Sequence, residues 1–486
     1  MKLLAIDIGA SGGKAAVGEF SSGALSITEV RRFPNSMIEI HGRLHWDILR
    51  LYDEVLKCIA AAPDAQSVGI DTWGVDYGYI GHDGDLMGLP FAYRDSRTEH
   101  SIPVVHDRIS QEELYSITGI QFLPFNTVYQ LMDDLLSRPW LVDNSKCILM
   151  MPELLGYLLT GQEFAEYSNA STTGILDVRT RKWSGEVLNR IGYPYERMPE
   201  IIDAGELKTA LNDRIKSETG SKADFVAVGC HDTASAVASI PASGDNWAYI
   251  SCGTWSLVGM ELPEPITSDA ARNVNFTNEG GVNGTIRFLT NVTGLWLLEE
   301  LRRMWALNGE VVDYSTIISE AEKAPAFRSI VNPDHPSFIA PDDMRAAIRA
   351  FCRKSGQTVP NGVGPFSRCV FESLALAYRK RIAQLSEISG RKIERIHMVG
   401  GGSRNEMLCR MTADACGIPV TAGPVEATMT GNLMMQGIAH GLIGSVLEGR
   451  EIVARSVKPV EYHPARIELW DNAAENFQDL LSAQTE

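Results

Sequence analysis

Residues 3–20 read LLAIDIGASGGKAAVGEF, and this stretch decides the fold. Residues 3–8 form a short apolar run that carries one aspartate, and residues 15–20 form a second run of small and apolar side chains. Between them lies a glycine-rich loop that ends at Lys14. Short apolar runs bounded by glycine predict two β-strands joined by a tight turn. A glycine-rich loop that ends in a cation indicates phosphate binding, and the spacing decides the type of loop.

Two common phosphate loops do not match the glycine spacing. The dinucleotide fingerprint requires G-x-G-x-x-G, whereas Gly9, Gly12 and Gly13 are spaced as G-x-x-G-G. The P-loop requires a longer gap before its Gly-Lys pair and a Ser or Thr after it, but Ala15 follows here. Both motifs continue into a helix, while residues 15–20 read as a strand. The remaining interpretation is a phosphate-binding hairpin, whose predicted phosphate contacts are Ala10, Ser11, Gly12, Gly13 and Lys14.

Asp7 lies near the end of the first strand, just before this loop. A carboxylate beside phosphate-binding amides would repel the phosphates unless a cation stood between them. The position therefore predicts Mg²⁺ at Asp7, held through water. Taken alone, the stretch also fits a structural hairpin with an aspartate at its turn.

The strand–loop–strand pattern recurs in the second half of the chain. Residues 247–262 read WAYISCGTWSLVGMEL, with Gly253 and Thr254 at the turn. Residues 394–405 read ERIHMVGGGSRN, a strand and a glycine turn before a helix, where backbone can approach an adenine or ribose closely. We therefore expect two related halves, residues 1–240 and 241–486, with a nucleotide in the cleft between them. The first half carries the first phosphate loop, and the second half binds the nucleotide.

Composition excludes several classes of partner. The 486 residues carry a formal charge of −17, which disfavours nucleic acid and anionic membranes because both require a basic surface. No segment approaches the roughly 18 apolar residues of a membrane-spanning helix, and the N-terminal residues do not resemble a signal peptide. The eight cysteines include no C-x-x-C pair. We therefore expect a cytoplasmic protein with small-molecule partners; the sequence carries no signal for its oligomeric state.

An ordered set of segments resembles one known family. DIGASGGK, GIDTWGVDYG, AYRDSRT, FNTVYQL, GCHDTASAV, SCGTWSLVG, NFTNEGG, NVTGLW and VGGGSRN occur in this order and cover the chain essentially from end to end. They are similar to segments of the FGGY carbohydrate kinases of the actin–hexokinase–Hsp70 superfamily, and most of all to the rhamnulokinases within it. Two positions depart from the pattern: Ala10 stands where many relatives have Thr, and Lys14 where the nearest often have Arg.

The resemblance implies an α/β fold of two ribonuclease H-like domains with a cleft between them, and it places sugar binding in the first domain, residues 1–240. It implies ATP- and Mg²⁺-dependent phosphorylation of a sugar, with L-rhamnulose converted to its 1-phosphate. Asp232 would be the catalytic base; from the residues alone, a helix cap and a base are equally open at this position. The resemblance further implies sugar contacts at Gly74, His231, Asp232, Thr233 and Asn291, and ATP contacts at the hairpin residues 10–14, Thr254, Glu299, Gly401 and Gly402.

Several interpretations stay open. Trp73 fits a sugar-facing ring or a core tryptophan equally well, and the polar residues near strand ends include simple turn formers: Asp71, Asp76, Asp95 and Arg97. The acceptor could be another ketose or polyol such as L-fuculose or D-xylulose. An interpretation from a different class is a non-catalytic, nucleotide-dependent sensor on the same scaffold.

Overall fold

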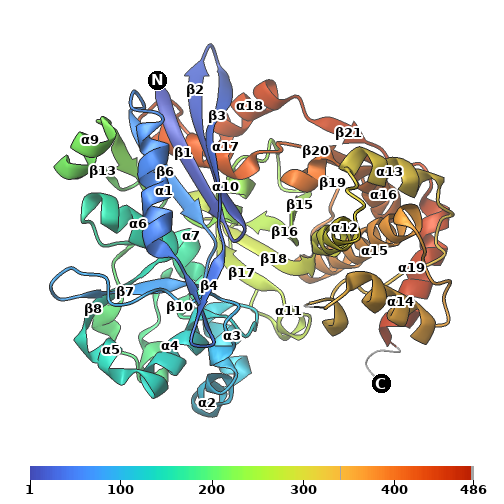
Figure 1. The fold of residues 1–486 in the computed structure, drawn as a ribbon, viewed down its shortest axis with the longest axis horizontal. Coiled ribbons are helices and arrows are strands. Elements are labelled where there is room, and N and C mark those ends of the chain that lie inside the picture. Colours follow the sequence, from blue (N-terminus) through green and yellow to red (C-terminus); the bar gives the residue numbers. More distant parts are fainter. Residues whose placement is uncertain (340, 483–486) are drawn as a thin grey trace. The chain divides into compact units, whose positions relative to one another are not determined.

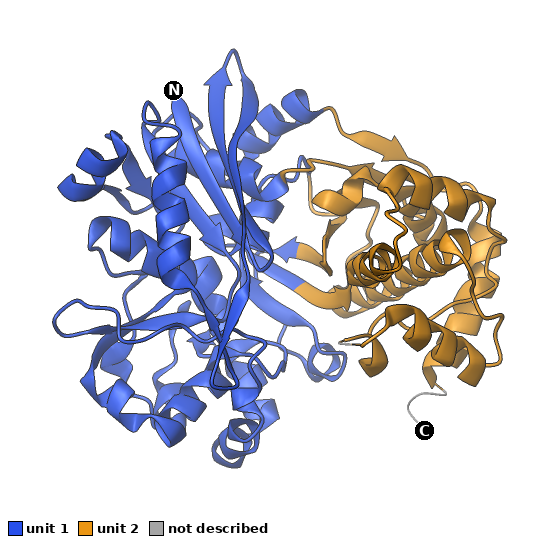
Figure 2. Ribbon diagram, in the orientation of Figure 1, with its two compact units in different colours: residues 1–243, 261–288, 427–457 blue, residues 244–260, 289–426, 458–486 orange. Residues whose placement is uncertain are grey.

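The computed structural model describes residues 1–339 and 341–482, and the chain forms two compact units. Unit 1 comprises residues 1–243, 261–288 and 427–457, and unit 2 comprises residues 244–260, 289–426 and 458–486 (Figure 2). Each unit is therefore built from segments that are distant in the sequence. In particular, a helix from the last quarter of the chain belongs to unit 1.

Unit 1 is organised around a mixed six-stranded sheet. Its first three strands form an antiparallel meander, and two further strands lie parallel to the first. The strand order is β13 (Lys208–Ala210), β14 (Asp224–Val226), β6 (Ser67–Thr72), β1 (Lys2–Gly9), β2 (Gly12–Ser21) and β3 (Ala24–Pro34). The two strands predicted within residues 3–20 and their tight turn are confirmed.

Helices cover both faces of this sheet (Figure 1). Side chains alternate along β1, so Leu4, Ile6 and Ile8 pack on one side with α1 (Ile48–Ala60) and α6 (Met151–Thr160). Leu3 and Ala5 pack on the other side with α17 (Ala427–Ala439). The first strand therefore has a buried apolar neighbour on each face, which explains its nearly continuous hydrophobic sequence.

The second sheet repeats this topology. Its hairpin strands β15 and β16 are antiparallel, β19 and β20 continue the sheet parallel to β15, and the edge strand β21 is antiparallel. The order is β17 (Thr277–Gly280), β18 (Ile286–Thr293), β16 (Trp255–Leu262), β15 (Trp247–Cys252), β19 (Arg395–Val399), β20 (Val420–Ala422) and β21 (Val460–Tyr462). The two sheets thus share one pattern of pairing, as expected for related halves.

Apolar side chains at spacings of four and three predict a long helix over residues 366–388, and unit 2 contains it. This helix is α15 (Val363–Ser389), and its predicted inner face is buried at Val370, Leu374, Tyr378, Ile382 and Leu385. The other helices of this unit are α12 (Trp296–Leu307), α13 (Tyr314–Lys323), α14 (Met344–Lys354), α16 (Glu406–Cys416) and α19 (Ile467–Ser482).

Residues 67–80 read SVGIDTWGVDYGYI, a strand pattern in which Trp73 and Gly74 are expected to end a strand. The chain leaves β6 at Thr72 and re-enters extended structure only at β7 (Tyr77–Gly81), which pairs with β8 (Ser145–Met150). Between them Val75 adopts a φ of 68°, which breaks the extended backbone. Both strands are buried throughout, so the hydrophobic pattern does not mark the break.

Smaller elements complete unit 1. Its remaining helices are α2 (Ser101–Arg108), α3 (Gln111–Thr118), α4 (Thr127–Ser137), α5 (Pro139–Asn144), α7 (Tyr167–Ala170), α8 (Gly185–Ile191), α9 (Asp213–Thr219), α10 (Asp232–Ala238), α11 (Asp269–Asn273) and α18 (Val446–Val457). Short two-stranded sheets pair β4 (Met37–Ile40) with β5 (Arg43–Trp46), β9 (Ala165–Glu166) with β12 (Ile201–Ile202), and β10 (Leu176–Asp177) with β11 (Lys182–Trp183). Within the described ranges, no helix has both the length and the apolar content that a membrane crossing requires.

Candidate active site

Asp232 is the first residue of α10 and does not cap it. The N-cap position is occupied by His231, and the Asp232 carboxylate accepts a hydrogen bond from Thr233 Oγ1 at 3.0 Å. The side chain of Asp232 is 31% exposed, whereas Thr233 is buried. The carboxylate is therefore accessible at the N-terminus of a helix. The helix-cap interpretation of Asp232 does not describe this geometry.

The end of β6 holds Asp232 beside the expected sugar contacts. Thr72 donates its N–H to Cys230 O at 2.9 Å and pairs with His231 in a parallel bridge. Gly74 follows at the break between β6 and β7, where an added Cβ would lie 2.8 Å from Thr172 Oγ1. A side chain at position 74 would collide with Thr172, so glycine is required by close packing at this point.

A buried carboxylate anchors the backbone before Asp232. Glu166 accepts the N–H of Cys230 at 2.9 Å and the hydroxyl of Ser168, and Ser168 Oγ in turn accepts the N–H of His231 at 3.2 Å. Glu166 is fully buried, and burial raises its pKa. Glu153 lies behind it and accepts the N–H of Glu166 at 3.0 Å. These contacts hold the loop that presents His231 and Asp232.

An ion pair holds the ring of His231 from a second side. Arg287 Nη2 donates to His231 Nδ1 at 3.0 Å and lies 3.1 Å from Glu279 Oε2. Burial raises the pKa of Glu279, but the positive charge of Arg287 beside it outweighs burial and brings the pKa below its usual value. The opposite ring nitrogen, Nε2, lies 3.5 Å from Asp232 Oδ1.

Two carboxylates from neighbouring strands lie side by side near the first hairpin. Asp7 in β1 is in register with Asp71 in β6 and with Lys14 in β2. Asp71 is fully buried and accepts a hydrogen bond from Asn432 Nδ2 at 2.6 Å, while its Oδ1 has no hydrogen-bond partner. Burial, and then the charge of Asp7, raise the pKa of Asp71 well above its usual value.

The predicted phosphate loop is a two-residue turn. Gly9 pairs with Gly12, so Ala10 and Ser11 form the turn between β1 and β2, and Ser11 is exposed. At Gly13 an added Cβ would lie 2.1 Å from the ring of Phe33. Gly13 therefore has to be glycine for packing, whatever it binds.

The candidate nucleotide residues of unit 2 gather around the β15–β16 turn. Thr254 is exposed at this turn, and its carbonyl accepts the N–H of Trp296 at 3.2 Å where α12 begins. Glu299 lies one turn further along α12 and accepts the hydroxyl of Tyr314. Gly402 packs against the end of β15, where an added Cβ would lie 2.2 Å from Cys252 Sγ.

Two further predicted contacts lie in unit 2. Gly401 is exposed in the short helical turn Gly401–Arg404, and an added Cβ there would meet nothing within 4 Å. Asn291 is half-buried in β18. Unit 2 thus contains four of the nine nucleotide candidates and one sugar candidate, Asn291, and unit 1 contains the others.

The carboxylate of Asp76 has a structural role inside the core. It is fully buried and accepts hydrogen bonds from the indole N–H groups of Trp46 and Trp73, from Tyr93 N and from Gln130 Nε2, at 2.7–3.1 Å. Burial raises its pKa to about 6 although four donors face it. Trp73 is 8% exposed and packs 4.2 Å from Trp46. The core interpretation of Trp73 is therefore the one that matches the structure.

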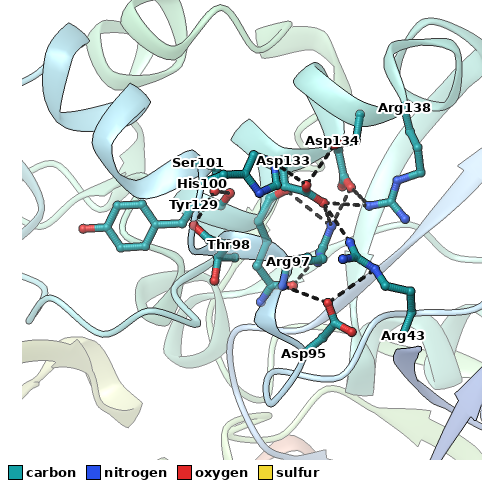
Figure 3. A network of polar contacts seen from close by, with 12 residues as sticks. Arg43, Asp95, Arg97, Thr98, His100, Ser101, Tyr129, Asp133, Asp134 and Arg138 are labelled. Carbon is teal, nitrogen blue, oxygen red and sulfur yellow. Dashed lines mark hydrogen bonds and ion pairs between the residues drawn. The ribbon is translucent and has the colours of Figure 1, made fainter.

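Asp95 and Arg97 also belong to an internal network (Figure 3). Arg97 is 3% exposed and donates to Asp134 at 2.6 Å and to Asp133 at 3.1 Å. Asp95 accepts Leu44 N at 2.7 Å and Arg97 N at 2.9 Å. Their contacts tie the segment after residue 94 to α4, so we assign both residues a structural role.

Sequence reasoning missed four residues at this site: Glu166, Glu279, Arg287 and Asn432. The segment NFTNEGG was noted without assigning its glutamate a partner. The signal that could have identified Arg287 is a charged side chain in the otherwise apolar strand IRFLTNVT. Asn432 offered no such signal, because its partner Asp71 is 361 residues away in the chain.

Known proteins match this chain over nearly its whole length. The model for the N-terminal domain of the FGGY family of carbohydrate kinases matches residues 2–239, and that for the C-terminal domain matches residues 248–440. The chain belongs to the FGGY family of carbohydrate kinases. The predicted family is therefore confirmed, and as a member the chain is a carbohydrate kinase that uses ATP.

Individual relatives agree with this assignment. The chain is 42% identical to the rhamnulokinase of Bacteroides thetaiotaomicron, with 98% of this chain and 99% of that protein covered. It is 38% identical to the rhamnulokinase of Bacillus subtilis, with 96% of each covered.

Solved structures of more distant kinases share the fold. A xylulose kinase from Rhodospirillum rubrum superposes with a TM-score of 0.80 at 14% identity, over 99% of both chains. A glycerol kinase from Plasmodium falciparum gives 0.78 at 14% identity, over 100% of this chain and 97% of that one. The expected α/β fold of the actin–hexokinase type is thereby confirmed.

Proposed function

We propose that this FGGY kinase transfers the γ-phosphoryl group of ATP to L-rhamnulose and forms L-rhamnulose 1-phosphate. The observation that carries the proposal is the identity of 37–42% to rhamnulokinases along almost the entire chain. The geometry around Asp232 supports it, since an accessible carboxylate at a helix N-terminus can accept the proton of a sugar hydroxyl. A reducing cytoplasm remains the proposed location.

Each residue near Asp232 has a proposed part in the transfer. Asp232 accepts the hydroxyl proton, and Thr233 orients the carboxylate through Oδ1. His231 and the backbone at Gly74 position the sugar, and Asn291 adds a further contact. Bound ATP supplies the phosphoryl group, and the surrounding residues orient the hydroxyl in line with it and exclude water, a competing acceptor.

We also propose that Mg²⁺ accompanies the nucleotide at Asp7. The donor set fits a hard cation, because Asp7 and Asp71 place carboxylate oxygens side by side and Oδ1 of Asp71 is unsatisfied. Among the described residues, no group of three His, Cys, Asp or Glu side chains could hold a metal by itself. Water and phosphate oxygens would therefore complete the coordination, as is usual for Mg²⁺ at phosphate sites.

The proposed nucleotide contacts are divided between the units. Residues 10–14 of unit 1 contact the phosphates through their backbone N–H groups and Lys14. Thr254, Glu299, Gly401 and Gly402 of unit 2 contact the remainder of the nucleotide. This division follows the two-part organisation proposed for residues 1–240 and 241–486.

A coupled ADP-release assay with L-rhamnulose, L-fuculose, L-ribulose and D-xylulose tests the substrate. We expect kcat/KM to be highest for L-rhamnulose by at least about tenfold, because a site built for one pattern of hydroxyls leaves polar groups unpaired with another. A higher value for another ketose would reassign the acceptor. ATP binding without turnover of any of the four sugars would favour the alternative interpretation, a non-catalytic, nucleotide-dependent sensor.

The variant Asp232→Asn tests whether Asp232 is the general base. It should bind ATP as the wild type does but lose about 10²- to 10⁴-fold in kcat, the usual contribution of a general base. Asp213→Asn is a matched control, because Asp213 is also the first residue of a seven-residue helix but its side chain is 99% exposed. Equal kcat for the two variants would contradict the assignment.

A further inference from the structure

The ion pair behind His231 offers a hydrogen-bond donor to a ring that can carry its proton on either nitrogen. Arg287 is fully buried and uses two of its N–H groups in directed contacts, Nε to Gly280 O at 2.8 Å and Nη2 to His231 Nδ1 at 3.0 Å. A guanidinium has only donors and keeps its charge at any ordinary pH. The nitrogen that faces it must therefore be the acceptor of the contact.

This contact decides the tautomer of His231. A proton on Nδ1 would meet the N–H of Arg287 at 3.0 Å, nearer than the acceptor Glu279 Oε2 at 3.4 Å, so two donors would face each other across the shorter contact. With the proton on Nε2, both ring nitrogens have a suitable neighbour, because Nε2 lies 3.5 Å from Asp232 Oδ1. We infer that Arg287, held by Glu279, is a positioning residue that keeps the proton of His231 on Nε2 and turns this N–H toward the carboxylate of Asp232 and the sugar.

Glu279 is needed for Arg287 to play this part. Its Oε2 lies 3.1 Å from Arg287 Nη2 and 3.4 Å from His231 Nδ1, close to both groups. Without a partner, a fully buried guanidinium would be strongly unfavourable. The backbone carbonyl of Gly280 fixes the other edge of the guanidinium, so the direction of the Nη2–H bond is set from two sides.

The arrangement divides the two oxygens of Asp232. Oδ1 accepts from Thr233 Oγ1 at 3.0 Å and faces the Nε2–H of His231. With Oδ1 engaged in this way, Oδ2 is the oxygen that receives the proton of the sugar hydroxyl. This assignment rests on the proposed function, because it specifies which carboxylate oxygen of Asp232 accepts the proton in that reaction. The tautomer of His231 does not depend on the sugar.

Nitrogen NMR on protein with ¹⁵N-labelled histidine rings measures the tautomer of His231 directly. The measurement does not require the protein to turn over a sugar. The His231 signals are identified by their loss in His231→Gln. We expect the wild-type ring to show a protonated Nε2 and an unprotonated Nδ1. The variant Arg287→Lys keeps a charged donor and should keep this tautomer. In the double variant Glu279→Gln/Arg287→Met, which removes donor and charge together, a substantial Nδ1–H population should appear.

Kinetics provide the second readout. We expect the double variant to lose about 10- to 100-fold in kcat with the KM for ATP unchanged within about twofold, and Arg287→Lys to lose much less. The matched control is Glu261→Gln/Arg450→Met, which removes another part-buried ion pair of unit 1, with 2.9 Å between the charged atoms. The control should keep wild-type kcat.

The outcomes separate this inference from the proposed function. A wild-type ring protonated on Nδ1 would overturn the inference, and so would a folded double variant with the wild-type tautomer and kcat. If the double variant does not fold, the wild-type and Arg287→Lys spectra still decide the tautomer. Absence of sugar kinase activity in the wild type would overturn the proposed function and leave the spectroscopic test intact.

Discussion

Replacing Glu153 by glutamine is expected to remove a large part of the pH dependence of stability. Glu153 lies in α6, is fully buried and accepts Glu166 N at 3.0 Å and Asn169 Nδ2 at 3.2 Å. Burial, and to a lesser degree the charge of Glu166, raise its pKa to about 8 from 4.5. The folded chain therefore binds this proton more tightly than the unfolded chain does.

The sign and the magnitude follow from linkage. Because the folded pKa is the higher one, protonation stabilises the folded state fully below pH 4.5, and this stabilisation is lost as the pH rises through about 8. The shift of about 3.5 pKa units is worth about 5 kcal/mol in total, of which about 4 kcal/mol disappears between about pH 5 and pH 9. A glutamine is neutral at every pH and lacks this contribution.

At acidic pH the variant should be nearly as stable as the wild type. Glutamine keeps one carbonyl oxygen, and its new amide can donate to Asn169 Oδ1, which is buried without a partner, once the Asn169 amide turns over. The expected cost at about pH 5 is about 1 kcal/mol or less. The variant should then become the more stable protein as the pH rises to about 9.

Urea unfolding at several pH values between about 5 and 9 measures this difference. The quantity to compare is the change in unfolding midpoint between wild type and Glu153→Gln at each pH, because other titrating groups cancel in it. Glu218→Gln is the control, since that side chain is 50% exposed. If the Glu153→Gln and wild-type midpoints fall in parallel with rising pH, the carboxyl is not held protonated and the reasoning fails.

Two further predictions concern single contacts. Asp76→Ala leaves two indole N–H groups, including that of Trp73, without an acceptor and should lower the free energy of unfolding by about 3 kcal/mol in urea titrations; an unchanged midpoint would contradict this. Gly402→Ala places a Cβ 2.2 Å from Cys252 Sγ and should lower the free energy of unfolding by about 1–3 kcal/mol. In Gly401→Ala the added Cβ meets nothing within 4 Å, so this variant should keep the wild-type melting temperature. It should raise the KM for ATP, because Gly401 is a proposed nucleotide contact. Equal melting temperatures for the two glycine variants would refute the packing argument.

Much of the fold followed from local sequence patterns. The glycine spacing and the alternation in residues 3–20 predicted the first hairpin, and the helical spacing after residue 365 predicted α15. These elements were predictable because neighbouring residues determine them. The positive φ of Val75 in the break after Thr72 was not, because both strands around it are buried and backbone conformation leaves no trace in hydrophobicity.

The candidate site was predictable only in part. The position of Asp232 left a helix cap and a base equally open, and the family resemblance selected the base; the structure places Asp232 as the first residue of α10. Whether it acts as the base stays a prediction until turnover is measured. The partners of Asp71 and His231 were not predictable, since Asn432 and Arg287 come from distant segments of the chain.

By itself, the sequence determined the two strand–loop–strand hairpins, the order of the motifs and the kinase family, because these depend on residue types at fixed short spacings. Tertiary structure alone decided which polar groups are buried together: Glu166 on the N–H of Cys230, Arg287 against the ring of His231 and Asn432 on Asp71. The physical reason is that a polar group inside the protein requires a specific partner within about 3 Å. Such a partner is supplied by the folded chain in space, at sequence separations that no local pattern records.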